Sequence, residues 1–257
     1  MVRIGLLLAL LFPFLAAPVT PAQRAAKPAT IDPVVMSLFR QLNQERVAHR
    51  LMPLLFDKNL ESAAEAHLAW ILRNPDELSH QYPGEPDLTA RAASAGAHLS
   101  VVAENIALGP DAFAIHRNWM NSPHHRDNIL DPRLDAVGIA VAHTAEGYMA
   151  VADYGLRVEL YTPEQVEAMV ALLLKDRSVS VSEEHEFARA ACRTDDGAPS
   201  GAHPKFIMRW QSPDLTILPD ALVERLARLP NAVAEVGACP ARNVGNFTAY
   251  RVAVLLR

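Results

Sequence analysis

The sequence is short of cysteine and has no excess of positive charge. Two cysteines in 257 residues exclude a disulfide-dense scaffold and any zinc site built from cysteine alone. The formal net charge is -5, so no basic surface for nucleic acid is expected. Because 50% of the residues are hydrophobic and 21% are charged, the chain has enough apolar side chains to bury a core. Its length suits one large or two ordinary domains.

The first 22 residues have the pattern of a cleaved secretory signal. Arg3 is followed by the apolar run Ile4 to Ala17, and Thr20 and Ala22 are small residues suited to cleavage. A retained anchor is the alternative, but the run is shorter than the roughly 20 residues that a spanning helix needs. No cysteine follows it, which argues against a lipoprotein anchor. We expect a signal peptide over 1–22, a disordered leader over 23–32, and a secreted or periplasmic mature chain without a transmembrane span.

Residues 33–157 are predicted to form helices first and a β-hairpin last. Asp32 and Pro33 supply a cap and a first-turn proline for the first helix. Ser122 is expected to cap a later helix in the same way. The expected elements are helices over 33–49, 57–73, 88–95, 110–121 and 122–130, a loop over most of 79–100, and a hairpin over 137–154.

Residues 158–257 are predicted to form a separate small α+β domain. Thr162 to Gln165 has the pattern of a capping box with proline at the first helical position. The expected elements are helices over 162–176, 183–191 and 218–229, and strands over 206–210, 233–238 and 250–256. These residues resemble no family that we identify and contain no catalytic constellation, so binding or docking is the expected role.

Several motifs of residues 34–157 occur in an order and spacing that resemble one family. They are Leu78-Ser79-His80, Arg91, Ala95-Gly96, Ala103-Glu104-Asn105-Ile106-Ala107, Trp119 to Leu130, Val137 to Ala140, and Asp153-Tyr154-Gly155. Together they resemble the bacterial branch of the CAP superfamily, the cysteine-rich secretory, antigen 5 and pathogenesis-related 1 proteins, also called SCP domains. The resemblance implies an α+β fold: a CAP-type α-β-α sandwich over 33–157, followed by the small C-terminal domain.

The resemblance also implies a cleft lined by histidine and acidic residues. His80 matches the first histidine of the family, Glu104 the acid of the Glu-Asn-Ile motif, and His125 the second histidine. The second family acid commonly stands where this chain has Ser122, so that group is missing unless Asp127 or another acid replaces it. His124 adds an imidazole next to His125, and its direction is left open.

Three roles for this cleft are weighed. His80 and His125 are candidate ligands for zinc or another divalent cation, which would leave positions free for water or a small-molecule, lipid or cell-envelope ligand. Glu104 is the candidate catalytic acid or base of a hydrolase acting on peptides or envelope polymers. The third role is structural, in which the cluster only ties loops together through hydrogen bonds. Because the second acid and a nucleophile are missing, binding without turnover is favoured over hydrolysis.

The two cysteines, Cys192 and Cys239, both lie in the C-terminal domain. In an exported protein they are expected to form a disulfide, and two free thiols are the alternative. The other histidines, His49, His67, His98, His116 and His143, are predicted to be surface or packing residues. The ligand and the oligomeric state are not predicted by the sequence.

Overall fold

The structure is a computed structural model that describes residues 32–257. The predicted signal peptide and all but the last residue of the predicted leader lie outside the described residues. Among residues 32–257, no helix is both long enough and apolar enough to cross a membrane.

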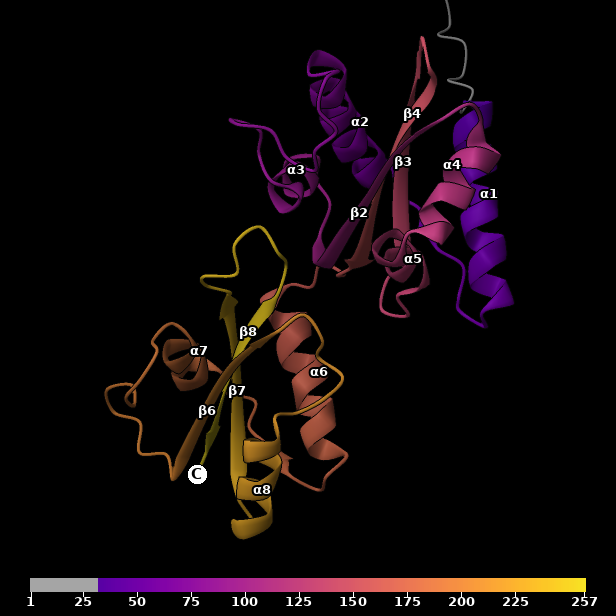
Figure 1. The fold of residues 1–257 in the computed structure, drawn as a ribbon. Coiled ribbons are helices and arrows are strands. Elements are labelled where there is room, and N and C mark those ends of the chain that lie inside the picture. Colours follow the sequence, from indigo (N-terminus) through magenta and orange to yellow (C-terminus); the bar gives the residue numbers. More distant parts are fainter. Residues whose placement is uncertain (1–31) are drawn as a thin grey trace, which may run out of the picture. The chain divides into compact units, whose positions relative to one another are not determined.

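The first part of the described chain is built on a four-stranded sheet with the strand order β1-β3-β4-β2 (Figure 1). Strand β1 is parallel to β3, and the other neighbours are antiparallel. Its elements, in chain order, are α1 (Pro33–Ala48), β1 (Leu55–Phe56), α2 (Lys58–Arg73), α3 (Leu88–Ser94), β2 (Leu99–Gly109), α4 (Ala112–Asn121), α5 (Pro123–Leu130), β3 (Ala136–Thr144) and β4 (Gly147–Arg157).

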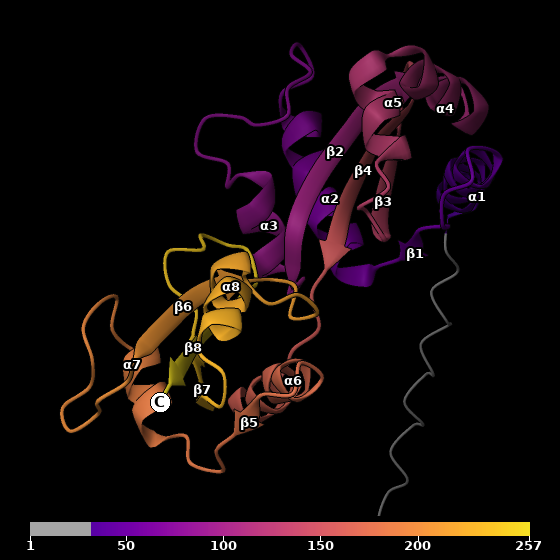
Figure 2. The same cartoon turned by 90° about the horizontal axis from the view of Figure 1, so that it is seen from below.

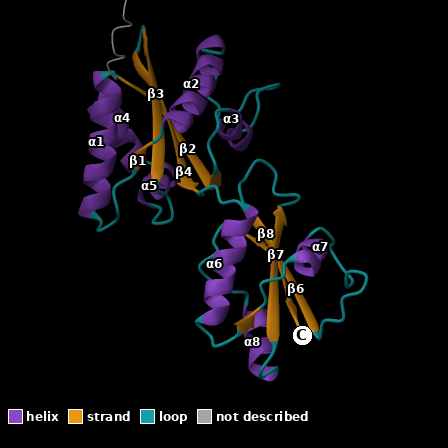
Figure 3. Ribbon diagram, turned by 180° about the vertical axis from the view of Figure 1, so that it is seen from behind, coloured by secondary structure: helices purple, strands orange, loops and turns teal. Residues whose placement is uncertain are grey.

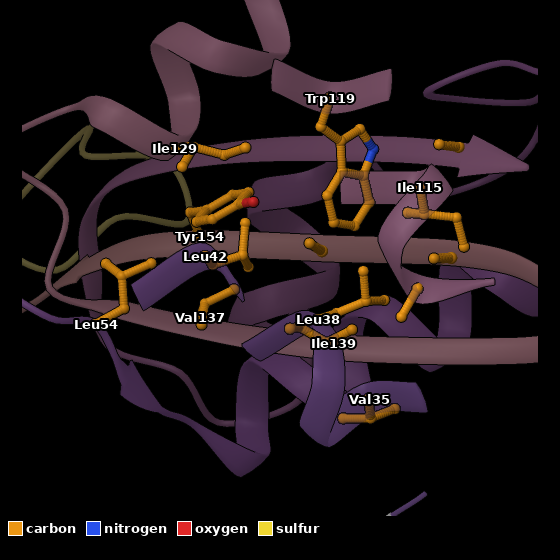
Figure 4. Close-up of a cluster of buried hydrophobic side chains, with 14 of the residues drawn as sticks. Val35, Leu38, Leu42, Leu54, Ile115, Trp119, Ile129, Val137, Ile139 and Tyr154 are labelled. Carbon is orange, nitrogen blue, oxygen red and sulfur yellow. The ribbon is translucent and has the colours of Figure 1, made fainter. Parts of the chain in front are cut away.

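Helices cover both faces of this sheet (Figures 1 and 2). Helices α1 and α4 enclose the largest apolar cluster on one face, where Trp119 and Tyr154 are fully buried (Figure 4). Helix α2 packs on the opposite face through Leu60, Ala64 and Leu68. Residues 33–157 therefore form the α-β-α sandwich that was expected, with Trp119 in its core.

Most local predictions for this sandwich are confirmed. The Asp32 carboxylate accepts a hydrogen bond from Val34 N at 2.7 Å, so it caps α1, and the hairpin is formed by β3 and β4. Ser122 stands at the N-cap of α5 as predicted, followed by Pro123 at the first helical position, although its side chain makes no capping hydrogen bond. The predicted loop over 79–100 ends too late, because β2 begins at Leu99.

The second part of the described chain has its own four-stranded sheet, with the order β5-β7-β8-β6. Helices α6 and α8 contribute to the apolar cluster on one face, and α7 packs on the other (Figure 3). Its elements are α6 (Pro163–Lys175), β5 (Ser180–Val181), α7 (Glu186–Cys192), β6 (Phe206–Ser212), α8 (Asp220–Arg228), β7 (Val233–Pro240) and β8 (Tyr250–Leu256).

The predicted α+β character of this part is confirmed in detail. Thr162 and Gln165 form the capping box of α6, and Cys192 and Cys239 form a disulfide with a Cα–Cα distance of 5.9 Å. Helix α7 begins at Glu186, three residues later than predicted. The domain boundary between residues 157 and 158 stays a prediction.

Candidate functional site

The candidate site is organised around Glu104, which lies in β2 on the face covered by α2 and α3. Its side chain is 4% exposed. The imidazole of His80, in the loop after α2, donates from Nδ1 to Glu104 Oε1 at 2.7 Å. The guanidinium of Arg91, on α3, donates to Glu104 Oε2 at 2.5 Å. Both carboxylate oxygens therefore already have partners within the protein.

A second carboxylate, that of Glu85, lies deeper in the same cluster. The buried His67 of α2 donates from Nδ1 to Glu85 Oε1 at 2.7 Å, while its Nε2 lies 3.6 Å from Glu104 Oε1. Arg91 Nη1 donates to Glu85 Oε1 at 3.2 Å, and the backbone N–H of Tyr82 donates to Glu85 Oε2 at 2.9 Å. Arg91 thus joins two buried carboxylates, and this network fixes the loop that carries His80.

Asp153 is a further acid that faces this cluster from β4. It is the register partner of Glu104 across the two antiparallel strands, so both side chains project from the same face of the sheet. Asp153 is 0% exposed, and within residues 32–257 its carboxylate oxygens make no hydrogen bond of good geometry. Burial and the negative charge of Glu104 raise the pKa of Asp153 well above its ordinary value, which favours the protonated acid.

Two asparagines attach α5 to β2 and so position His125. Asn105 Nδ2 donates to the backbone oxygen of His125 at 2.9 Å. Asn128 Nδ2 donates to Asn105 Oδ1 at 2.9 Å and to the backbone oxygen of Glu104 at 3.1 Å. The ring centres of His80 and His125 are 6.4 Å apart as a result. Asn105, the neighbour of Glu104 in β2, thus holds α5 against the strand.

The electrostatics of the cluster keep Glu104 charged. Burial raises the pKa of Glu104, but the hydrogen bond from His80 and the proximity of His67 and Arg91 outweigh it, so the pKa lies below its ordinary value. Burial, followed by the influence of His80 and His124, lowers the pKa of His125. At neutral pH the site therefore offers an ionised carboxylate on the inside and a neutral His125 imidazole nearer the surface.

The other residues predicted for the cleft are less involved. His124 and Asp127 are exposed on α5, and Asp127 makes none of the hydrogen bonds of the cluster. Ser122 is half-buried at the start of α5. Of the alternatives left open, Asp127 or another acid, the structure brings a different acid, Asp153, beside Glu104.

Sequence reasoning missed His67, Glu85 and Asp153 as members of the cluster. His67 had a usable signal, because it shares the apolar face of its helix with Leu60 and Ala64, where a polar side chain needs a partner. His67 was predicted to be a surface or packing residue. It is buried as a packing residue would be, but it also forms a hydrogen bond with the carboxylate of Glu85. Glu85 and Asp153 gave no such signal, since one lies in an irregular loop and the other within a strand.

A zinc site with three protein ligands does not fit these residues. Among residues 32–257, no three histidine, cysteine, aspartate or glutamate side chains converge on one point as metal ligands. Glu104 has both oxygens committed to His80 and Arg91. The two imidazoles of His80 and His125 are the groups left to meet a ligand.

Comparison with known proteins agrees with the motifs and the fold. Residues 39–154 match the family model described as the cysteine-rich secretory protein family, CAP. The chain carries a CAP domain. The uncharacterized protein YkwD of Bacillus subtilis is 28% identical to the chain over 113 residues, which cover 44% of each protein. The chain thus matches less than half the length of this curated relative.

Solved structures similar to the CAP domain come from several bacteria. An extracellular protein with an SCP domain from Bacillus anthracis is 23% identical, with a TM-score of 0.43, and the match covers 48% of this chain and 40% of that one. A cysteine-rich secretory protein from Staphylococcus aureus is 22% identical, with a TM-score of 0.39 and coverages of 51% and 41%. An outer surface protein from Borrelia burgdorferi is 21% identical, with a TM-score of 0.43 and coverages of 47% and 90%.

Proposed function

We propose that the CAP domain binds a small polar ligand outside the cytoplasm through His80 and His125, without turning it over. The observation that carries the proposal is the pairing of His80 Nδ1 with Glu104 Oε1 at 2.7 Å. A carboxylate that accepts from one ring nitrogen fixes the tautomer and the direction of the ring. The other nitrogen of His80, Nε2, is then left as a hydrogen-bond acceptor for a ligand, with His125 as its neighbour.

The same contacts argue against turnover. A general base needs an available lone pair and a pKa near the working pH. Glu104 has a lowered pKa, its side chain is 4% exposed, and each of its oxygens already accepts a hydrogen bond from the protein. Asp153 is completely buried behind it and has no access to solvent. The carboxylates therefore suit the orientation of imidazoles better than the transfer of protons to a substrate.

An extracellular or periplasmic location belongs to the same proposal. Residues 1–22 have the composition of a secretory signal, and the Cys192–Cys239 disulfide suits an oxidising compartment. Two of the similar structures are named as extracellular or outer surface proteins. A ligand from the cell envelope or from the medium is therefore the class to search for.

Native mass spectrometry of the exported full chain tests the proposal directly. We expect a bound small molecule on the wild type and a lower occupancy in His80→Ala and in His125→Ala. Each substitution removes one hydrogen bond to the ligand, so we expect the Kd to rise at least about fivefold per variant. Metal analysis of the same samples decides whether the ligand is a cation.

His124→Ala is the matched control, because His124 is an exposed histidine next to His125 on the same helix. It should keep the ligand. The proposal fails if both cleft variants retain the ligand at the wild-type level, or if no small molecule or envelope fragment binds the wild type. Stoichiometric zinc that disappears in both cleft variants would replace the polar ligand with a metal ion.

A further inference from the structure

The two sheets of the chain have the same topology. The first has the order β1-β3-β4-β2 and the second the order β5-β7-β8-β6. In each sheet the first pair is parallel and the other two pairs are antiparallel. If α3 and α5 are removed from the first part, the chain order of helices and strands also becomes identical. Helix α6 then corresponds to α1, α7 to α2, and α8 to α4.

One close contact between a helix and a strand occurs at the same place in both sheets. A Cβ on Gly138 of β3 would lie 2.1 Å from Leu60 C and 1.9 Å from Glu61 N, the third and fourth residues of α2. A Cβ on Gly237 of β7 would lie 2.2 Å both from Ala188 C and from Arg189 N. These are the third and fourth residues of α7. Both helices thus start by placing the same peptide bond on a strand glycine.

This glycine correspondence predicts further matching pairs. Counting from the helix start pairs Ala64 with Cys192, and counting from the glycine pairs Ala140 with Cys239. Cys192 and Cys239 form the disulfide between α7 and β7. Ala64 and Ala140 are both buried in one apolar cluster between α2 and β3. The disulfide therefore bridges the positions at which the first sheet brings two alanines together.

The second part lacks the segments that carry the candidate site. His80, Glu85 and Arg91 lie between α2 and β2, and His125 lies on α5. Helix α5 has no counterpart, and a loop alone joins α7 to β6. Ala253 stands where the first sheet has Asp153, because each residue pairs with the strand glycine of its own sheet.

The register places an arginine where the first sheet has its central acid. In the first sheet, Gly138 pairs with Asp153, which in turn pairs with Glu104. In the second sheet, Gly237 pairs with Ala253, which in turn pairs with Arg209. Arg209 therefore corresponds to Glu104. Arg209 Nε donates to the oxygen of Ala191 at 2.7 Å, and its Nη2 donates to that of Gly197 at 2.5 Å. The arginine thus binds the end of α7, which has 7 residues where α2 has 16.

We infer that residues 163–256 are a second copy of the CAP fold that has lost the ligand-binding segments. In this copy Arg209 occupies the strand position that corresponds to Glu104. The family match ends at residue 154 and does not reach this copy. The chain is then a tandem of two related folds, and the histidine site belongs to the first.

An engineered disulfide in the first fold tests the correspondence without touching the histidines of the site. In the full chain, Ala64→Cys combined with Ala140→Cys should form a disulfide, because the equivalent pair Cys192 and Cys239 does so. We expect both introduced thiols to resist labelling in the folded protein and to become reactive after reduction. Ala64→Cys combined with Ala142→Cys is the control, since Ala142 lies about 7 Å further along the strand, beyond disulfide geometry.

Thiols at residues 64 and 140 that stay reactive in a folded variant would overturn the correspondence. Circular dichroism establishes whether each double variant folds. The sheet order can also be measured in the wild type by cross-strand nuclear Overhauser contacts, so the inference does not depend on the variants. Contacts of Ala253 with both Gly237 and Arg209 are expected, and a direct neighbourhood of Gly237 and Arg209 would refute it.

Discussion

The two sheets share a strand order but differ in what covers the face beneath α2 and α7. On the first sheet this face carries Glu104 and Asp153, and a buried network continues through Arg91. On the second sheet it carries Ala253, Arg209 and the disulfide of Cys192, and the buried Glu235 accepts from the backbone N–H of Ala188 on α7 at 2.9 Å. The same strand order is therefore compatible with either set of residues on this face. The candidate site depends on the segments that surround the first sheet and have no counterpart in the second, which supply the partners that its buried charges need.

The largest effect is expected where the two sheets are alike. Gly138→Ala and Gly237→Ala each place a Cβ about 2 Å from the backbone of a helix, and backbone cannot move aside as a side chain does. Each variant should lose about 4 kcal/mol or more of the free energy of unfolding, or fail to fold. Urea denaturation of the full chain measures the loss.

Gly155→Ala is the control for these variants, because the three atoms nearest to its Cβ would be side-chain atoms of Leu99. It should cost about 1–2 kcal/mol, since a flexible side chain can give way. If Gly237→Ala proves as mild as this control while Gly138→Ala does not, the likeness of the two helix contacts is lost.

A smaller effect should separate the two arginines. Arg91→Ala leaves Glu85 and Glu104, which are 0% and 4% exposed, without their guanidinium partner, and we expect a loss of about 3–5 kcal/mol. Arg209→Ala removes hydrogen bonds mainly to neutral carbonyl oxygens, and about 1–2 kcal/mol is expected. Urea midpoints at neutral pH measure both losses.

The double variant Arg91→Met/Glu104→Gln sharpens this difference, because it removes both charges together. It should recover part of the stability lost in Arg91→Ala. Equal losses in Arg91→Ala and Arg209→Ala would mean that an arginine between buried carboxylates stabilises the fold no more than one bound to neutral carbonyl oxygens.

The smallest effect concerns the ionisation of His125, which has no equivalent in the second sheet. Burial, His80 and His124 lower its pKa from 6.5, so its proton should leave below that pH in a nuclear magnetic resonance titration of the ring. A depressed histidine pKa contributes stability that is intact above 6.5 and declines as the pH falls below 6.5. His124→Gln should move the midpoint upward, and a midpoint above 6.5 in the wild type would contradict the burial of the ring.

The sequence was sufficient for elements with a clear period or cap. Asp32-Pro33 located the start of α1, and the alternation from Val137 to Tyr154 located the hairpin. Strand β2 was not predicted, because Glu104 and Asn105 interrupt an otherwise apolar run that is covered on both sides. Strands β1 and β5 have two residues each, too few for any period to show.

The candidate site was predictable only in the part that resembles the family. His80, Glu104 and His125 follow the motifs, and the structure brings them together. Asp153 was quoted as part of a motif but not as a site residue, because the register of β2 against β4 decides what it faces. Register between distant strands is a property of tertiary packing, and no local pattern reports it.

The glycine contact also bears on how related folds can be detected. A side chain is visible to sequence comparison because it has a chemical identity that relatives can share. Gly138 and Gly237 matter through atoms they do not have, and a single glycine is too common to be noticed in an alignment. Two halves of a chain could therefore diverge at nearly every other position and still pack their helices at the same distance from the sheet. Such duplications would be found by comparing where a helix backbone approaches a strand too closely for a side chain, rather than by comparing residue types.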